Sequence, residues 1–162
     1  GYELLKEYDI LFNYEKDEIQ LVKPNYFDTF QKEMTHLTNP TRLPFNMEKH
    51  LPVIDCYIGQ KKLALAIDSG AESNLIEESL FDQLSHTLDE ITSDTLTGAG
   101  KNSREVPTGS LKSLKFGNIV FSGMHTVFSD ISHLNKGYSM NINGILGYEF
   151  ILKLRKEIIF YD

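Results

Sequence analysis

The chain has 162 residues, of which 41% are hydrophobic and 24% are charged, a balance typical of a soluble globular domain with a sizeable core. Its formal net charge of −7 argues against a nucleic-acid-binding protein, which would need a basic face. No apolar run approaches the roughly 20 residues needed to cross a bilayer, so we expect no membrane span. The single Cys56 excludes an internal disulfide and any multi-cysteine metal site.

The first segment of the chain predicts a β-hairpin, a helix and a linker. Residues 9–14 and 18–22 are apolar stretches separated by turn residues, which indicates two paired strands. Residues 24–37 carry large apolar side chains near helical spacing and predict a short amphipathic helix. Residues 38–44 contain two prolines, which fix the backbone and remove hydrogen-bond donors, so we expect a linker there.

The middle of the chain predicts mostly short strands. Residues 51–58 and 62–67 flank Gly59-Gln60-Lys61 and indicate a second hairpin. Residues 76–84 predict a helix, because acidic residues occupy the first turn, where the helix dipole favours them. Four strands separated by turns should follow, at residues 93–97, 110–116, 119–122 and 125–129. After residues 142–147 we expect a helix at 148–154 and a strand at 157–161.

The two ends of the chain resemble each other. Gly1-Tyr-Glu precedes an apolar stretch, and Gly147-Tyr-Glu precedes the apolar residues before Tyr161. Such an echo is typical of a duplicated architecture. We therefore divide the chain into an N-terminal extension, residues 1–46, and a main lobe, residues 47–162. It stays open whether the extension is the tail of a preceding lobe.

An apolar strand runs directly into Asp68-Ser69-Gly70. A strand of this kind delivers the carboxylate into a site walled by protein, where its pKa can be tuned, and Gly70 permits a tight turn. One carboxylate alone is a weak catalyst. Two carboxylates about 3 Å apart share a proton, so one can take a proton from water while the other polarises a peptide carbonyl.

A second motif lies near the end of the chain. Asn143-Gly-Ile-Leu-Gly-Tyr places an apolar pair and a glycine just before a predicted helix, and the glycine-containing stretch Thr95–Asn102 lies between the two motifs. Together with Ile67-Asp-Ser-Gly-Ala71, this order resembles the retropepsin-like aspartic proteases, in particular bacterial single-lobe members. The resemblance covers roughly residues 51–161.

The resemblance implies a fold, an activity and a set of site residues. The fold would be an all-β acid-protease lobe, a closed β-barrel with one or two short helices, behind an N-terminal extension. No metal and no organic cofactor would be needed, because water is the nucleophile. The implied catalytic loop is Asp68, Ser69 and Gly70. The residues that would support this loop from behind are Ala71, Ile145, Leu146 and Gly147. The implied flap, which would cover the substrate, is Thr97, Gly98, Ala99 and Gly100.

The sequence contains one Asp-Ser-Gly and no Asp-Thr-Gly, so it supplies half of a catalytic pair. The partner carboxylate would come from the second subunit of a homodimer or from an upstream lobe of a longer chain. The leading hypothesis is an aspartic endopeptidase acting on peptide or protein substrates. The alternative is a catalytically inactive binding or assembly module of the same fold. A secreted or periplasmic bacterial protein is our working assumption for its location.

Other interpretations of the same residues are weaker. Asp68 could simply cap a turn at a strand end. Asp68-Ser-Gly-Ala-Glu-Ser73 also fits a phosphodegron pattern, but such motifs must be exposed and flexible, whereas this one continues an apolar strand. Residues 98–103 imitate a phosphate-binding loop but lack its first glycine and its magnesium-binding hydroxyl. The histidines lack zinc-site spacing.

Overall fold

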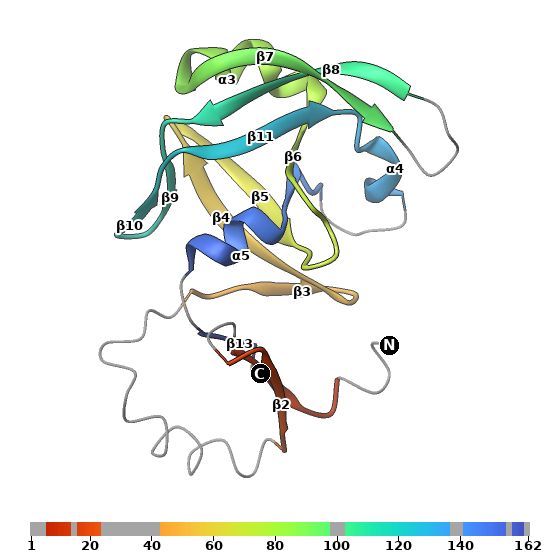
Figure 1. Cartoon of the computed structure of the whole chain (residues 1–162), viewed down its shortest axis with the longest axis vertical. Coiled ribbons are helices and arrows are strands. Elements are labelled where there is room, and N and C mark those ends of the chain that lie inside the picture. The colour runs from red at the N-terminus through yellow and green to blue at the C-terminus, as the bar shows by residue number, and fades with distance from the viewer. Residues whose placement is uncertain are drawn as a thin grey trace. The chain divides into compact units, whose positions relative to one another are not determined.

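The structure is a computed structural model, and it describes residues 6–13, 16–23, 43–97, 103–136, 141–154 and 157–160 (Figure 1). The chain forms two compact units, one made of residues 1–42 with 154–162 and the other of residues 43–153. The expected boundary at residue 46 between an extension and a functional lobe remains a prediction. The predicted helix at 24–37 and its linker fall mainly outside the described residues.

The first unit contains a three-stranded antiparallel sheet in the order β13-β1-β2. Its strands are β1 (Asp9–Asn13), β2 (Glu18–Val22) and β13 (Glu157–Phe160). β1 and β2 form the predicted hairpin, with Asp17 in the turn at a φ of 55°. The predicted strand near the end of the chain is also confirmed, and it pairs with β1, Ile10 lying opposite Phe160.

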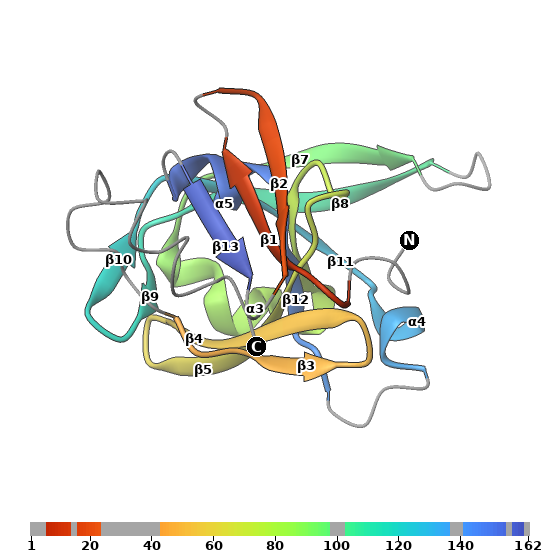
Figure 2. The same cartoon turned by 90° about the horizontal axis from the view of Figure 1, so that it is seen from below.

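The second unit is built on a 10-stranded sheet in the order β10-β9-β4-β5-β12-β6-β11-β8-β7, with β3 paired to β4. Figures 1 and 2 show this sheet curling into a half-barrel. The all-β prediction is confirmed. The strands are β3 (Asn46–Glu48), β4 (Leu51–Ile58), β5 (Lys61–Ile67), β6 (Asn74–Glu77), β7 (Leu88–Thr97), β8 (Ser103–Leu111), β9 (Leu114–Phe116), β10 (Ile119–Phe121), β11 (Met124–Ser129) and β12 (Gly144–Leu146).

Short helices pack against this sheet. They are the 3-10 turns η2 (Glu78–Leu80) and η3 (Ser85–Thr87) and the α-helices α3 (Phe81–Leu84), α4 (Ser132–Asn135) and α5 (Tyr148–Lys153). Phe150 of α5 packs its ring against Phe116 and Phe121, with centroids 5.5 Å and 5.3 Å away. These contacts fix α5 against the β9–β10 hairpin, which holds the chain just before the helix in place.

The helix predicted at residues 76–84 is wrong in its first two residues, and its next three form a 3-10 turn rather than an α-helix. Residues 74–77 form β6, and helical structure begins only at Glu78. Leu75 lies opposite Val127 of β11 on one side and Ile145 of β12 on the other. Because neighbours on both edges complete its hydrogen bonds, tertiary pairing overrides the local helical pattern.

Other boundaries also differ from the sequence prediction. β7 begins at Leu88 rather than at residue 93, and the strand expected at 110–116 divides into the end of β8 and the separate β9. Strand β3 and helix α4 were not predicted. Both are short, and β3 has three residues, two of them exposed, which give little alternation to detect.

Candidate active site

The Asp68 loop connects two strands that do not touch each other directly. β5 ends at Ile67, the loop spans residues 68–73, and β6 begins at Asn74. β12 lies between the two strands, parallel to β5 and antiparallel to β6. Leu146, the last residue of β12, is the register partner of Ile67. The loop therefore passes over the end of β12, where a strand from the far end of the chain supports it.

Backbone hydrogen bonds tie the loop to the chain that follows β12. The Asp68 N–H donates to the Leu146 carbonyl at 3.0 Å, and the Tyr148 N–H donates to the Ala71 carbonyl at 2.8 Å. Within the loop, the Ala71 N–H donates to the Asp68 carbonyl at 3.1 Å, which closes a tight turn. The start and the middle of the loop are thus both fixed to residues 146–148.

The Asp68 carboxylate is oriented by its own loop. Its Oδ1 accepts the Gly70 N–H at 2.9 Å, an Asx-type turn that restricts the side-chain rotamer. Asp68 is half-buried, whereas Ser69 and Gly70 are exposed. The carboxylate thus lies at the rim of the protein surface, with one oxygen held and the residues after it open to an incoming molecule.

Gly147 lies against the loop so closely that no side chain fits. A Cβ atom at this position would lie 2.5 Å from the Ala71 carbonyl oxygen and 2.6 Å from that of Ser73. Gly144, at the start of β12, is equally confined, since its Cβ would lie 2.3 Å from the Leu75 carbonyl oxygen. The glycines of the second sequence motif therefore allow β12 and the turn after it to pass directly beneath the loop.

Comparison with protein-family models matches residues 54–150 to a family described as aspartyl protease. This segment is more than half of the chain and contains both the Asp68 loop and the β12–α5 junction. The chain belongs to this aspartyl protease family. The family resemblance drawn from the two sequence motifs is thereby confirmed.

A search of solved structures found, among others, a retropepsin-like aspartic protease from Rickettsia conorii. It is 13% identical to this chain, with a TM-score of 0.44, and the match covers 69% of this chain and 77% of that one. No match was found among curated protein sequences.

The structure brings most of the predicted site residues of this chain together. Asp68, Gly70 and Ala71 are linked by the loop's own hydrogen bonds, and Leu146 and Gly147 lie directly behind them. Ile145 and Leu146 are buried in β12, with 8% and 1% of their surface exposed. Ser69 is part of the same loop. The catalytic and supporting roles of these residues remain predictions.

The predicted flap falls at the end of a long hairpin. β7 and β8 pair from Leu88 opposite Leu111 as far as Thr97 opposite Ser103. Thr97 is therefore the last described residue of one arm, and Gly98, Ala99 and Gly100 lie outside the described residues. The arms near that end, residues 91–95 and 103–105, are exposed.

Sequence reasoning missed one side chain at this site, that of Asn74. It is 1% exposed, and its Oδ1 accepts the Gly147 N–H at 3.0 Å. Its Nδ2 donates to the His125 carbonyl at 2.9 Å. An asparagine after Asp-Ser-Gly-Ala-Glu-Ser resembles an ordinary turn residue. The available signal was its position immediately before the apolar pair Leu75-Ile76, which places it at the start of a strand.

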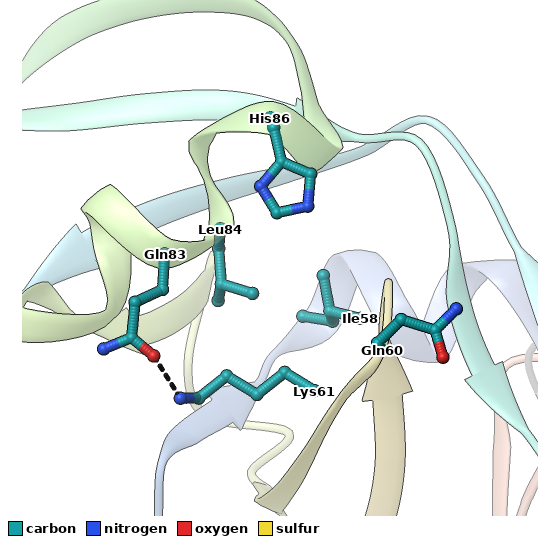
Figure 3. A pocket seen from close by; sticks show the side chains of 6 residues that line it. All are labelled: Ile58, Gln60, Lys61, Gln83, Leu84 and His86. Carbon is teal, nitrogen blue, oxygen red and sulfur yellow. Dashed lines mark hydrogen bonds between the residues drawn. The ribbon is translucent and has the colours of Figure 1, made fainter.

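An open pocket of about 340 Å³ lies elsewhere in the second unit (Figure 3). In it, the Lys61 ammonium donates a hydrogen bond to the Gln83 side chain. Lys61 begins β5 and Ile67 ends it, so a strand rising about 3.3 Å per residue separates pocket and Asp68 by about 20 Å. The pocket is therefore not part of the Asp68 site. Its lining residues are Ile58, Gln60, Lys61, Gln83, Leu84 and His86.

Metal-binding clusters and membrane-spanning helices are both absent from the described part of the chain. Within it, no three His, Cys, Asp or Glu side chains gather as they would around a metal ion. Among its helices, none has the length and apolar character required to span a bilayer.

Proposed function

We propose that this chain is an aspartic endopeptidase subunit in which Asp68 supplies one of two carboxylates that activate a water molecule. The observation that carries the proposal is the Asp68 loop itself. Its carboxylate lies half-buried at the rim of the fold, with Oδ1 held by the Gly70 N–H, inside the segment that matches the aspartyl protease family. A fixed carboxylate at an accessible rim is the arrangement that general acid–base catalysis requires.

The chemistry follows from sharing one proton between two carboxylates. Two such groups at close distance cannot both ionise, so one is protonated while the other carries the charge. The ionised carboxylate removes a proton from water, and the oxygen of that water attacks the peptide carbonyl carbon. The protonated carboxylate donates a hydrogen bond to the carbonyl oxygen and stabilises the charge that develops there. Later proton transfer to the amide nitrogen releases the amine product.

The second carboxylate has to come from outside this sequence, which holds a single Asp-Ser-Gly. We propose that it belongs either to Asp68 of a second copy, related by a two-fold axis, or to a further lobe of a longer natural chain. In both cases one subunit or lobe alone is inactive. The site forms only when two Asp68-type loops face each other.

The β7–β8 hairpin supports a peptide as the substrate class. Its exposed arms extend beyond the half-barrel, and an extended peptide can add strand-like hydrogen bonds to backbone groups of this kind. We propose that residues 97–100 close over such a peptide and that hydrophobic residues flank the bond that is cleaved.

A peptide-library cleavage assay at mildly acidic pH tests the proposal. Wild type is compared with Asp68→Asn, which removes the ionisable group and keeps the shape, and with Asp82→Asn, which makes the same change at an exposed position of α3. We expect Asp68→Asn to lower the cleavage rate by about 10²–10⁴-fold and Asp82→Asn to leave it unchanged. Equal cleavage by wild type and Asp68→Asn would disprove the catalytic role.

The same assay separates the endopeptidase from the inactive binding module. If neither wild type nor Asp68→Asn cleaves any peptide at concentrations that favour association, a homodimeric endopeptidase is ruled out and the chain by itself acts only as a binding or assembly domain. Where wild type does cleave, mixing it with Asp68→Asn identifies the source of the second carboxylate. Activity that falls with the square of the wild-type fraction indicates two copies per site, whereas a linear fall indicates one Asp68 per site.

A further inference from the structure

Asn74 is a buried polar side chain whose hydrogen-bonding groups are both used. Its Oδ1 accepts the Gly147 N–H at 3.0 Å and its Nδ2 donates to the His125 carbonyl at 2.9 Å. Only 1% of its surface is exposed. A buried carboxamide is unfavourable unless it is hydrogen-bonded, so this position requires a side chain with one acceptor and one donor in this geometry.

The two partners define which way the carboxamide points. Gly147 presents an N–H and His125 presents a carbonyl, so rotating the amide by half a turn would place oxygen against oxygen and nitrogen against N–H. The orientation therefore follows from chemistry. Asn74 joins the start of β6 to β11 on one side and to the residue before α5 on the other.

In the described part of the chain, the acceptor for the Gly147 N–H is the Asn74 side chain. Gly147 is buried and directly precedes α5, whose first turn leaves its N–H groups without helical carbonyls. Its neighbours are already used on the same loop, because the Leu146 carbonyl accepts from Asp68 and the Tyr148 N–H donates to Ala71. Three consecutive residues thus hold the loop at its start, its middle and its end, and only the bond at the end uses a side chain.

We propose that Asn74 is a positioning residue for Asp68. It fixes the C-terminal end of the 68–73 loop to Gly147 and to β11. This keeps the loop in the position in which the Asp68 carboxylate can face the second carboxylate of the pair. Without this bond the loop remains tied at its first residue and at Ala71 but can lift at its end. The inference rests on the proposed function for its catalytic meaning, and its structural part can be tested without any activity.

The first measurement is amide hydrogen exchange on the full chain, followed by NMR. Loss of a buried hydrogen bond that leaves the Gly147 N–H unpaired should speed exchange of that amide about 10-fold or more in Asn74→Ala, and the Asp68 and Tyr148 amides should follow it. The matched control is Thr87→Ala. Thr87 is also buried, its hydroxyl donates to the Leu84 carbonyl, and it lies near Gly59 at the other end of β5.

A second variant distinguishes positioning from a general loss of packing. Asn74→Asp keeps the shape of the side chain. When protonated it offers one acceptor for Gly147 and one O–H donor for the His125 carbonyl. The ionised form offers no donor and sets a charged oxygen against the His125 carbonyl oxygen, which pushes the side chain out of place and weakens its bond to Gly147 as well. Burial raises the pKa of an introduced carboxyl. We therefore expect Gly147 protection within about threefold of wild type at about pH 4, and a loss of about 10-fold or more at about pH 8.

The third measurement applies where the wild type cleaves peptides. A loop that mispositions the carboxylate without altering peptide binding should lower kcat about 10- to 100-fold in Asn74→Ala, with KM within about threefold of wild type. At acidic pH Asn74→Asp should recover most of that kcat, and Thr87→Ala should keep it throughout.

The outcomes separate the two proposals. The positioning role is overturned if Asn74→Ala leaves exchange at Gly147 and Asp68 unchanged, or changes it no more than Thr87→Ala does. It is also overturned if Asn74→Asp shows no dependence on pH. An inactive wild type whose loop amides respond as described would instead count against the endopeptidase proposal, while supporting Asn74 as the residue that holds the loop.

Discussion

Gly147 shows how strongly a single position controls the Asp68 loop. A Cβ there would lie 2.5 Å from the Ala71 carbonyl oxygen, which is backbone and cannot move without moving the loop. For a Cβ at Gly70 the nearest atom would be the Asp68 Oδ1, at 3.3 Å, on a half-buried side chain that can adjust. Gly147 is therefore needed for the packing beneath the loop, whereas Gly70 contributes its backbone N–H to the turn that holds the carboxylate.

This difference predicts unequal effects of the same substitution. Gly147→Ala should lower the free energy of unfolding by about 3 kcal/mol, because it forces two backbone segments apart. Gly70→Ala should lower it by less than about 1 kcal/mol, as is usual for an exposed position. Urea denaturation of the two variants measures both values. A Gly147→Ala protein as stable as Gly70→Ala would contradict the close packing of the loop.

Cys56 offers a further test at the residue scale. It is fully buried in β4, and burial, followed by the charge of Asp55, raises the pKa of its thiol to about 12. We expect no reaction with a thiol reagent at about pH 8 in the folded protein and rapid reaction in urea, because the reactive thiolate requires a low pKa and access. Rapid labelling of the folded chain at that pH would show that β4 is not buried as described.

The same pKa shift gives a pH dependence with a definite sign. In the unfolded chain the thiol ionises above its ordinary pKa of 9.0, whereas in the folded chain it does so only near 12. The contribution of Cys56 is fully present below about pH 9, and the free energy of unfolding falls as the pH rises from there towards 12. Cys56→Ala should show a smaller fall over this interval when wild type and variant are unfolded in urea at each pH.

At the level of single residues, the sequence predicted a role where that role depends on neighbours in the chain. Asp68, Ser69 and Gly70 are recognisable because an apolar strand and a turn surround them. Asn74 is different, since its two partners are 51 and 73 residues away in the chain. Its importance depends on which strands become neighbours, and a lone asparagine after a turn does not reveal that.

Among the elements, the hairpins were predictable and the arrangement of β5, β12 and β6 was not. β1–β2 and β4–β5 are each joined by short turns with marked turn residues, so pairing is encoded locally. β12 joins β5 through residues such as Leu146 and Ile67, which are far apart in sequence. The same long-range pairing placed the first two residues of the helix expected at 76–84 in strand β6, and the rest of that segment forms short helices.

The β7–β8 hairpin is the element expected to move most. A bulge between Asp89 and Thr92, with Glu90 at a φ of 53°, separates its inner part from the exposed outer arms. We predict that amides of residues 94–96 exchange at least about 100-fold faster than those of residues 63–66 in β5, because exposed strands open at low free energy. Hydrogen exchange with residue-level detection measures this. Equal protection of the two strands would rule out a mobile substrate-covering hairpin.

On the scale of the whole molecule, the central feature is a half-site. The fold presents one held aspartate, and the proposed chemistry needs two. If two copies meet, the specific activity should rise with protein concentration and reach a plateau when the dimer is saturated. Dilution series of the cleavage assay, compared with light scattering at the same concentrations, check this expectation. A strict monomer that shows no cleavage at any concentration would remove the homodimer and leave a further lobe as the source.

The most direct test of Asp68 as a catalytic residue is the ratio of kcat/KM for wild type and Asp68→Asn on the same best-cleaved peptide. Both proteins should be measured at mildly acidic pH, after unfolding curves show that they are equally stable. We expect a loss of about 10²–10⁴-fold in Asp68→Asn, with Asp82→Asn indistinguishable from wild type. A folded Asp68→Asn protein that keeps the wild-type kcat/KM would contradict this catalytic role.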